Sequence, residues 1–406
     1  MFFTGGKFTI YQPIILYRKF SADQIFNRDK FLQNHVLITD RKGIIVDLIK
    51  KEDAGDGIER SEGILCPGFI NAHCHLELSH MKGVIPKHTG LVDFVLKVVN
   101  ERHFEEEEIL EAIEQAENEM LQNGIVAVGD ICNNAFCIHQ KNEGRMHYYN
   151  FIETSGFPPA VAEQRFKRAT DIYNTYAASL PFNSFVPHAP YSVSTEMFRM
   201  INDYLGNNLI SIHNQETAAE NEFFEKGTGD ILSLYEKMGI DISFYTPPGK
   251  SSFQTWLPQF TNGQSVISVH NVCTTKKDIE FAKLQTSNLK LQIFFCLCPN
   301  ANLYISNSLP DIEMLIQQDC DIVLGTDSLA SNDQLSILEE MRTIQKHFRD
   351  IDLATLLKWA TMNGARALQM DKTLGSFEKG KQPGVLLIEK ADVSVISENT
   401  SLKRIL

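Results

Sequence analysis

Short apolar runs alternate with helical stretches along most of this chain, and this rhythm limits the fold more than any other feature. The runs are rich in Val, Ile and Phe, and several are nearly uninterrupted, which is typical of parallel strands buried on both faces. There are eight of them: 65–75, 124–130, 146–153, 182–188, 208–213, 265–270, 291–298 and 321–327. Eight strand–helix units in this order predict an α/β fold, a (β/α)8 TIM barrel.

The clearest helix is expected over 104–122, where apolar residues recur on one face and Asn123-Gly124 ends the pattern. That face contains Ile109, Leu110, Ile113, Ala116 and Met120. The acidic run 105–108 fits a solvated first turn that suits the helix dipole better than an acidic site. The last helical segment is expected over 353–368.

The two chain ends follow a different pattern. Short β-like runs at 8–11, 35–39 and 43–46 precede the first barrel run, and two more follow the last helix at 384–388 and 393–396. The turn at Asp40-Arg41-Lys42-Gly43 suggests antiparallel pairing of its neighbours. We therefore expect a small β-sandwich domain built from both ends, with residues 1–64 and 371–406 flanking a barrel of residues 65–370.

Composition excludes some partners. The 406 residues carry 38 basic and 51 acidic side chains, a net charge of −13, without a local Lys/Arg cluster, which argues against nucleic acid. No stretch has the length of a membrane span, and the first residues lack a signal-peptide pattern. Several of the eight cysteines lie inside apolar runs, as reduced, packed thiols do. We expect a cytoplasmic protein, with a homodimer left open.

His73-Cys74-His75 ends the first barrel run. Because side chains at i and i+2 of a strand share a face, both imidazoles point one way and Cys74 points the other. Two neutral imidazoles can hold a borderline metal such as zinc. Alone this pattern is weak, since surface or packing histidines are commoner.

The ends of the other predicted strands strengthen the prediction of a metal site. A (β/α)8 barrel carries its active site at the carboxyl ends of its strands. Of twelve histidines, five end predicted strands, and Asp327 ends the eighth. The five are His73, His75, His188, His213 and His270. Structural histidines have no reason to follow this register, so the pattern predicts nitrogen and oxygen ligands for zinc or iron.

Glu216 follows His213 by three residues and would lie in the loop beside the same metal. A carboxylate placed there can take a proton from a metal-bound water and pass it to a ring nitrogen or a leaving group. An isolated His-x-x-Glu would be read as a helix-start glutamate, but the ligand set favours a functional group.

These segments resemble the metal-dependent amidohydrolase superfamily, in the branch that contains nucleoside deaminases and s-triazine chlorohydrolases. The matching segments cover nearly the whole chain and occur in the family's order. They are 67–75, 187–192, His213-x-x-Glu216, His270, 298–303, 325–328 and 374–381. Gln382-Pro383-Gly384-Val385 departs from the Ala-Asp pair of many relatives, and the loop after His75 lacks the usual tryptophan.

The resemblance implies the role of each residue. The metal ligands would be His73, His75, His213 and Asp327. Glu216 would be the proton shuttle, His270 would orient the hydroxide, and His188 would contact substrate. Asp327 would also accept the first proton from water. Binuclear members generally carry a strand-4 lysine, which 182–190 lacks, so one divalent metal is expected, zinc first and iron second.

The element His75-Leu76-Glu77 resembles the aminodeoxyfutalosine deaminase branch, which implies an adenine-bearing substrate. Glu77 would bind a ribose hydroxyl or brace the loop, and His80 would be structural or a rim contact. We expect hydrolytic deamination of an adenine-type nucleoside, such as S-adenosylhomocysteine, methylthioadenosine or aminodeoxyfutalosine, with release of ammonia. The alternatives are a cyclic amidohydrolase or chlorohydrolase with the same site, and a noncatalytic binding barrel.

Overall fold

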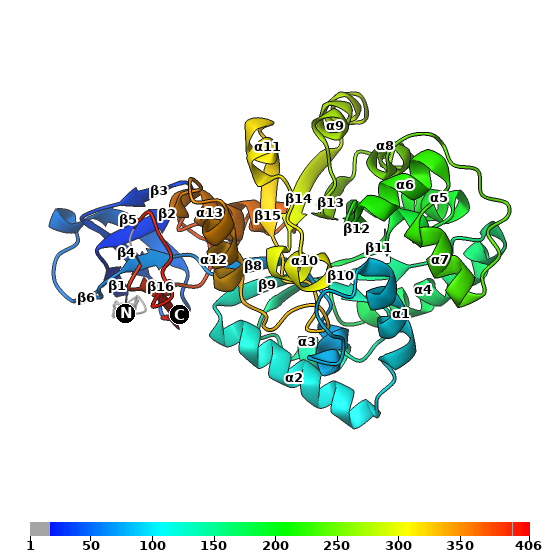
Figure 1. The fold of residues 1–406 in the computed structure, drawn as a ribbon. Helices are drawn as coiled ribbons and strands as arrows, with labels where there is room; N and C mark the ends of the chain where they lie inside the picture. The colour runs from blue at the N-terminus through cyan, green and yellow to red at the C-terminus, as the bar shows by residue number, and fades with distance from the viewer. Residues whose placement is uncertain (1–16, 392) are drawn as a thin grey trace, which may run out of the picture.

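Two four-stranded parallel sheets form the centre of the computed structural model, which describes residues 17–391 and 393–406 (Figure 1). In spatial order the first contains β11 (Asn183–Pro187), β10 (His147–Thr154), β9 (Ile125–Cys132) and β8 (Phe69–Cys74). The second contains β12 (Leu209–Asn214), β13 (Ser265–His270), β14 (Gln292–Leu297) and β15 (Asp321–Leu324). The expectation of an α/β fold with parallel strands is confirmed.

Backbone hydrogen bonds join the two sheets at both borders, near the carboxyl ends of the strands. His213 N donates to His188 O (3.0 Å), which connects β12 to the residue after β11. Asp327 N donates to His73 O (3.1 Å), and Cys74 and Asp327 form a parallel bridge. The strand ends that carry the predicted site are therefore fixed to one another.

Side chains on the two faces of these strands enter different apolar clusters. The inner cluster contains Ile70, Phe151, Ile267 and Phe294, whereas the outer cluster, which contains Ile152, faces the helices. Neighbours such as Phe151 and Ile152 enter opposite clusters because strand side chains alternate. Both clusters consist of buried residues, as expected for strands covered on both faces.

Helices surround these sheets (Figure 1). They are α1 (Leu91–Glu101), α2 (Glu106–Gln122), α3 (Ile138–Asn142), α4 (Ala162–Ala177), α5 (Thr195–Asp203), α6 (Ala218–Lys226), α7 (Asp230–Met238), α8 (Ser252–Trp256), α9 (Lys276–Leu289), α10 (Pro299–Ser306), α11 (Ile312–Gln317), α12 (Ile337–His347), α13 (Leu353–Lys358) and α14 (Gly364–Ala367). Helix α2 matches the expectation for 104–122, except that Leu110 is 38% exposed. The expected helix 353–368 is α13 and α14 joined by a π-helical segment, Trp359–Asn363.

Strands from both chain ends form two further sheets. One has the order β5 (Ile45–Lys50), β4 (His35–Thr39), β1 (Arg18–Ser21), β6 (Ile58–Arg60). The other has the order β17 (Ser401–Arg404), β16 (Leu386–Glu389), β7 (Ile64–Cys66), β2 (Gln24–Asn27), β3 (Lys30–Leu32). The two ends meet where β16 pairs antiparallel with β7. The expected strand 8–11 lies outside the described residues.

Two strand predictions need correction. The run 65–75 is two strands in different sheets, β7 and β8, separated at Pro67-Gly68. A Cβ on Gly68 would lie 2.3 Å from Val126 Cγ1, so only glycine allows this close crossing. Residues 393–396 form no strand, and β17 lies at Ser401–Arg404 instead.

All eight cysteines lie in the described residues and are free of disulfides. Among the helices that the structure describes, none combines the length and apolarity needed to cross a bilayer.

Candidate metal centre

His73 and His75 point to the same place at the end of β8, with their Nε2 atoms 3.2 Å apart. A register shift against β9 lies between Asn71 and Cys74, and it changes the alternation of this strand. Ala72 therefore lies in the inner cluster while Cys74 lies in the outer one. The two imidazoles face inward and Cys74 packs behind them.

His213 and Asp327 complete this cluster. His213 Nε2 lies 3.3 Å from His75 Nε2, and Asp327 Oδ1 lies 3.5 Å from His73 Nε2 and 3.4 Å from His75 Nε2. All four side chains are buried. Three imidazoles and one carboxylate therefore converge from β8, β12 and the turn after β15.

Burial and hydrogen bonds keep His75, His213 and Asp327 in the forms that bind a cation. His213 Nδ1 lies 2.7 Å from His188 O, so it carries the proton and leaves a lone pair on Nε2. Burial lowers the pKa of His75 to about 3 and that of His213 well below its usual value. Burial opposes ionisation of Asp327, but its hydrogen bond with His73 and the nearby imidazoles hold its pKa well below the ordinary range. Neutral imidazoles and an ionised carboxylate are what zinc or iron binds, so this donor set fits a divalent metal.

The backbone at Asp327 is held in a left-handed conformation, with φ +58°. Asn71 fixes the preceding residue by two hydrogen bonds: Asn71 Nδ2 donates to Thr326 Oγ1 (2.8 Å), and Thr326 N donates to Asn71 Oδ1 (3.0 Å). Strained conformations of this kind persist where the surroundings fix them, and they gather at functional sites.

His270 ends β13 and also has a left-handed backbone, with φ +73°. Asn302 Nδ2 donates to His270 Nδ1 (3.0 Å), which places the imidazole proton on Nε2. One ring nitrogen of His270 lies within 4.8 Å of ligand atoms of His73, His213 and Asp327. By distance alone His270 could replace His75 as a ligand, but a protonated Nε2 makes it a donor.

Glu216 lies between β12 and α6, and its Oε2 is 3.8 Å from His270 Nε2. Burial raises the pKa of Glu216 well above its usual value, and the charges of Asp327 and Glu220 raise it further. A carboxyl group that keeps its proton near neutral pH can donate it to a substrate.

A buried ion pair supports the turn after His75. Asp130 Oδ1 accepts a hydrogen bond from Leu76 N (2.8 Å), and Lys141 Nζ lies 2.5 Å from Asp130 Oδ2. Lys141 also donates to Asn150 Oδ1 (2.8 Å). Both charged side chains are fully buried. This pair was not found from the sequence, because a lone Asp and Lys carry no pattern.

The other predicted substrate residues lie beside the cluster. His188 is half-buried, and its ring lies 4.8 Å from that of His213. Glu77 is 2% exposed, and its Oε2 accepts a hydrogen bond from Asn133 N (2.8 Å). His80 lies apart from the cluster, where its Nε2 contacts Arg102 O (3.0 Å).

Sequence reasoning missed Glu153, which lies at the end of β10. One of its carboxylate oxygens and ring nitrogens of His188 and His213 lie within 4.8 Å of one another. The rule that selected the histidines, a position at a strand's carboxyl end, would also have selected Glu153.

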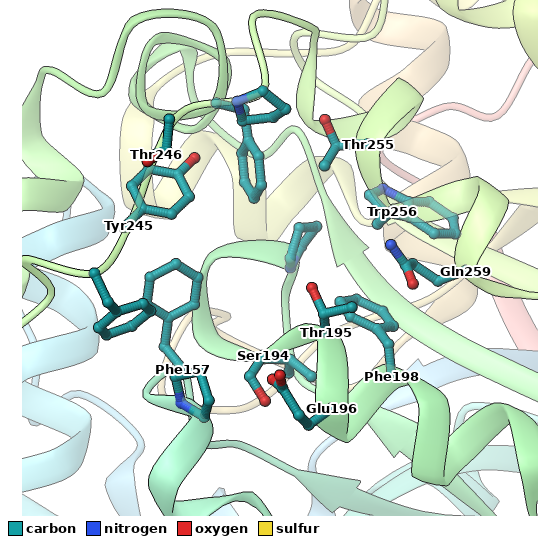
Figure 2. Close-up of a pocket in the computed structure, with 16 residues that line it drawn as sticks. Phe157, Ser194, Thr195, Glu196, Phe198, Tyr245, Thr246, Thr255, Trp256 and Gln259 are labelled. Carbon is teal, nitrogen blue, oxygen red and sulfur yellow. The ribbon is translucent and has the colours of Figure 1, made fainter.

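A separate cavity of about 280 Å³ lies beside α5 and α8 (Figure 2). Its wall contains the aromatic rings of Phe157, Phe198, Tyr245 and Trp256 and none of the residues that converge at the metal centre.

The comparisons with known proteins identify the family. The model of the amidohydrolase family matches residues 64–404. The chain belongs to the amidohydrolase family. It is 24% identical over 385 residues to a 5-methylthioadenosine/S-adenosylhomocysteine deaminase of Saccharophagus degradans, which covers 88% of this chain and 79% of that protein.

Two solved structures of similar fold show how far this amidohydrolase resembles known enzymes. Helicobacter pylori aminofutalosine deaminase, in complex with methylthio-coformycin, has a TM-score of 0.78 at 22% identity, and the match covers 93% of each chain. An adenosine deaminase from Xanthomonas campestris with bound zinc has a TM-score of 0.69 at 23% identity, covering 91% of this chain and 84% of that one. At these identities the likeness establishes a common fold.

Proposed function

We propose that this amidohydrolase is a metal-dependent deaminase that converts an adenine-type nucleoside and water into the 6-oxo nucleoside and ammonia. The observation that carries this proposal is the convergence of His73, His75, His213 and Asp327. Beside them lies Glu216, whose carboxyl group has a pKa raised by burial. The names of the relatives support adenine nucleosides as the substrate class.

The ligands of one divalent ion would be His73, His75, His213 and Asp327. When bound, the ion supplies Lewis-acid chemistry: it lowers the pKa of a water and so provides a nucleophile at neutral pH. The strand-4 segment offers His188 and no lysine, which favours one ion over two.

The side chains around the ligands would move the protons. Asp327 would take the first proton of the attacking water, since its carboxylate is kept ionised. His270 would donate a hydrogen bond from Nε2 to the water oxygen and so orient it. Glu216 would protonate the ring nitrogen next to the carbon that carries the amino group. Asp327 would then pass its proton to the amino group, which leaves as ammonia, and Glu216 would recover a proton from the added hydroxyl.

His188 and Glu77 would contact the rest of the substrate. His188 is the more accessible of the two, which fits a position at the entrance. Glu77 contacts the same region through Asn133, where it would bind a ribose hydroxyl or brace the loop.

The eight parallel strands would close as a (β/α)8 barrel over residues 65–370, since backbone bonds join the two sheets at both borders. Residues 1–64 and 371–406 would form one β-sandwich, which is supported by a common apolar cluster that includes Phe20, Leu65 and Leu387.

Ammonia release tests the function. The zinc-loaded protein is incubated with adenosine, methylthioadenosine, S-adenosylhomocysteine, aminodeoxyfutalosine, guanine and an amino-triazine. We expect ammonia from at least one adenine nucleoside. Absence of ammonia with all amino-heterocycles would reject the deaminase, and hydrolysis of a chloro-triazine or a cyclic amide would identify the related reaction instead. A protein that takes up neither zinc, iron nor manganese would be a binding barrel.

A further inference from the structure

Glu153 is placed by its strand to face the interior of the site. Tyr149 and Phe151, four and two residues earlier on β10, both lie in the inner cluster. Because strand side chains alternate, Glu153 leaves the same face at the carboxyl end of the strand. It therefore projects to the side of the sheet on which the metal centre lies.

One oxygen of Glu153 is held and the other has no partner. Asn133 Nδ2 donates to Glu153 Oε2 (2.8 Å), while Asn133 N donates to Glu77 Oε2 (2.8 Å). The Oε1 atoms of Glu153 and Glu77 are buried and without a hydrogen-bond partner in the described part of the chain. A buried acceptor without a donor costs about 1–3 kcal/mol, so such atoms usually await a ligand or a water.

His188 presents a second free acceptor beside Glu153. The Ser192 hydroxyl donates to Ala189 O (2.9 Å), so its oxygen accepts the proton of His188 Nδ1, 2.9 Å away. His188 Nε2 is then the ring nitrogen left to face a ligand. One ring nitrogen of His188 lies within 4.8 Å of a Glu153 carboxylate oxygen.

Two adjacent acceptors need two donors from a ligand. A second cation would have only these two ligands, because His213 Nδ1 donates to His188 O and His213 Nε2 faces the metal cluster. The amino group that reacts would lie beside Glu216 and Asp327, the groups proposed to move its protons. Two neighbouring hydroxyl groups of a ligand fit these acceptors. Each hydroxyl can donate one hydrogen, and two neighbouring hydroxyls lie close enough together to reach two adjacent acceptors.

We propose that Glu153 and His188 bind the two neighbouring ribose hydroxyls of the nucleoside, with Glu77 fixing Glu153 through Asn133. This inference rests on the proposed function, because it assumes a nucleoside substrate. The pair would make the enzyme selective for ribonucleosides over deoxynucleosides.

The experiment removes the ribose hydroxyls from the substrate and the Glu153 carboxylate from the protein, separately and in combination. For the adenine nucleoside that the zinc-loaded protein deaminates fastest, kcat/KM is measured with the ribose form and with its 2′,3′-dideoxy form. We expect the unmutated protein to prefer the ribose form by about 10- to 100-fold, the effect of hydrogen bonds to a charged group. In Glu153→Gln, activity on the ribose form should fall and the preference should shrink to a few-fold.

Glu143→Gln, at an exposed position between β9 and β10, is the matched control and should retain the preference. Zinc content and the increase in Tm on adding each nucleoside are measured for all three proteins. An unmutated protein that deaminates both forms equally well would overturn the Glu153 proposal and leave the deaminase standing. Equal losses on both forms in Glu153→Gln, or loss of zinc, would also overturn it. No nucleoside deamination at all would overturn both.

Discussion

Ser331 Oγ donates a 2.6 Å hydrogen bond to Asp327 Oδ2, and Asp327 Oδ1 is left facing His73 and His75. The serine thus decides which carboxylate oxygen is available to a metal. Hydrogen bonds of this kind orient metal ligands, and their loss typically costs 10- to 100-fold in affinity or activity.

Ser331→Ala should therefore lower zinc affinity and kcat/KM by about 10- to 100-fold, because Asp327 can then rotate. Competition with a chelator measures the affinity. Ser287→Ala, at an exposed position on α9, is the control. Unchanged zinc affinity in Ser331→Ala would mean that the backbone hydrogen bonds at Asp327 hold its carboxylate in place without Ser331.

Glu216→Gln should keep its metal and lose turnover, since Glu216 transfers protons without coordinating the ion. We expect kcat to fall by at least about 100-fold, a usual contribution of a positioned acid or base. Metal analysis and ammonia release are measured on the same preparation. Loss of zinc in parallel with activity would assign Glu216 to the ligand set.

Lys141→Met should destabilise the protein by about 3–5 kcal/mol, because Asp130 then stays buried without its counter-charge. The double variant Asp130→Asn, Lys141→Met should recover part of this loss. Urea unfolding gives the free energies. Lys237→Met removes the exposed pair with Asp93 and should change stability by less than about 1 kcal/mol. If Lys141→Met had as little effect, the buried pair would not support the turn after His75.

Glu340 predicts a pH dependence of stability. Burial raises its pKa to about 8, above an ordinary value of 4.5, although Asn300 N and Asn332 Nδ2 donate to its oxygens. The folded protein therefore holds this proton longer than the unfolded chain. Its contribution is complete below about pH 4.5 and is lost as the pH rises through about 8.

In urea unfolding from pH 5 to 8, this one proton should reduce the free energy of unfolding by at most about 1.4 kcal/mol per pH unit. Glu340→Gln should reduce the slope by that amount, whatever its effect on absolute stability, while other buried glutamates such as Glu216 keep the remainder. The exposed Glu313→Gln should leave the slope unchanged. A slope as steep in Glu340→Gln as in the unmutated protein would assign the titration to other groups.

Metal removal should lower Tm, because the lone pairs of three buried imidazoles and Asp327 then face one another without a cation. Binding to the folded state alone stabilises by about 4 kcal/mol at 1,000 times Kd. Calorimetry before chelation, after chelation and after zinc is restored measures the shift. A Tm that chelation leaves unchanged, with zinc shown to be gone, would mean that the cluster is stable without metal.

Much of the fold was predictable because it follows from the local periodicity of apolar residues in the sequence. Parallel strands and helix α2 follow from apolar runs whose spacing does not depend on distant residues. The break at Gly68 was missed because its cause is Val126, a residue far along the chain. Strand β17 was misplaced for a similar reason: it is fixed by pairing with β16, and its own sequence has little apolar character.

The candidate site was partly predictable by position. The histidines and Asp327 lie where the strand-end rule places them, and their catalytic roles stay predictions. Geometry added what periodicity lacks: the positive φ of His270, the choice between His75 and His270, and Glu153. Ser331 and Lys141 act through contacts with Asp327 and Asp130, and single contacts of this kind leave no repeating pattern in a sequence.

The pairing of β16 with β7 has a consequence for the order of events during synthesis. The ribosome releases β7 more than three hundred residues before its neighbour β16. Until β16 has been made, β7 exposes unpaired amides and carbonyls, which are a template for pairing with another chain. The last residues to be translated therefore close this edge, and a chain cut short before them should aggregate even though all the proposed metal ligands have been made.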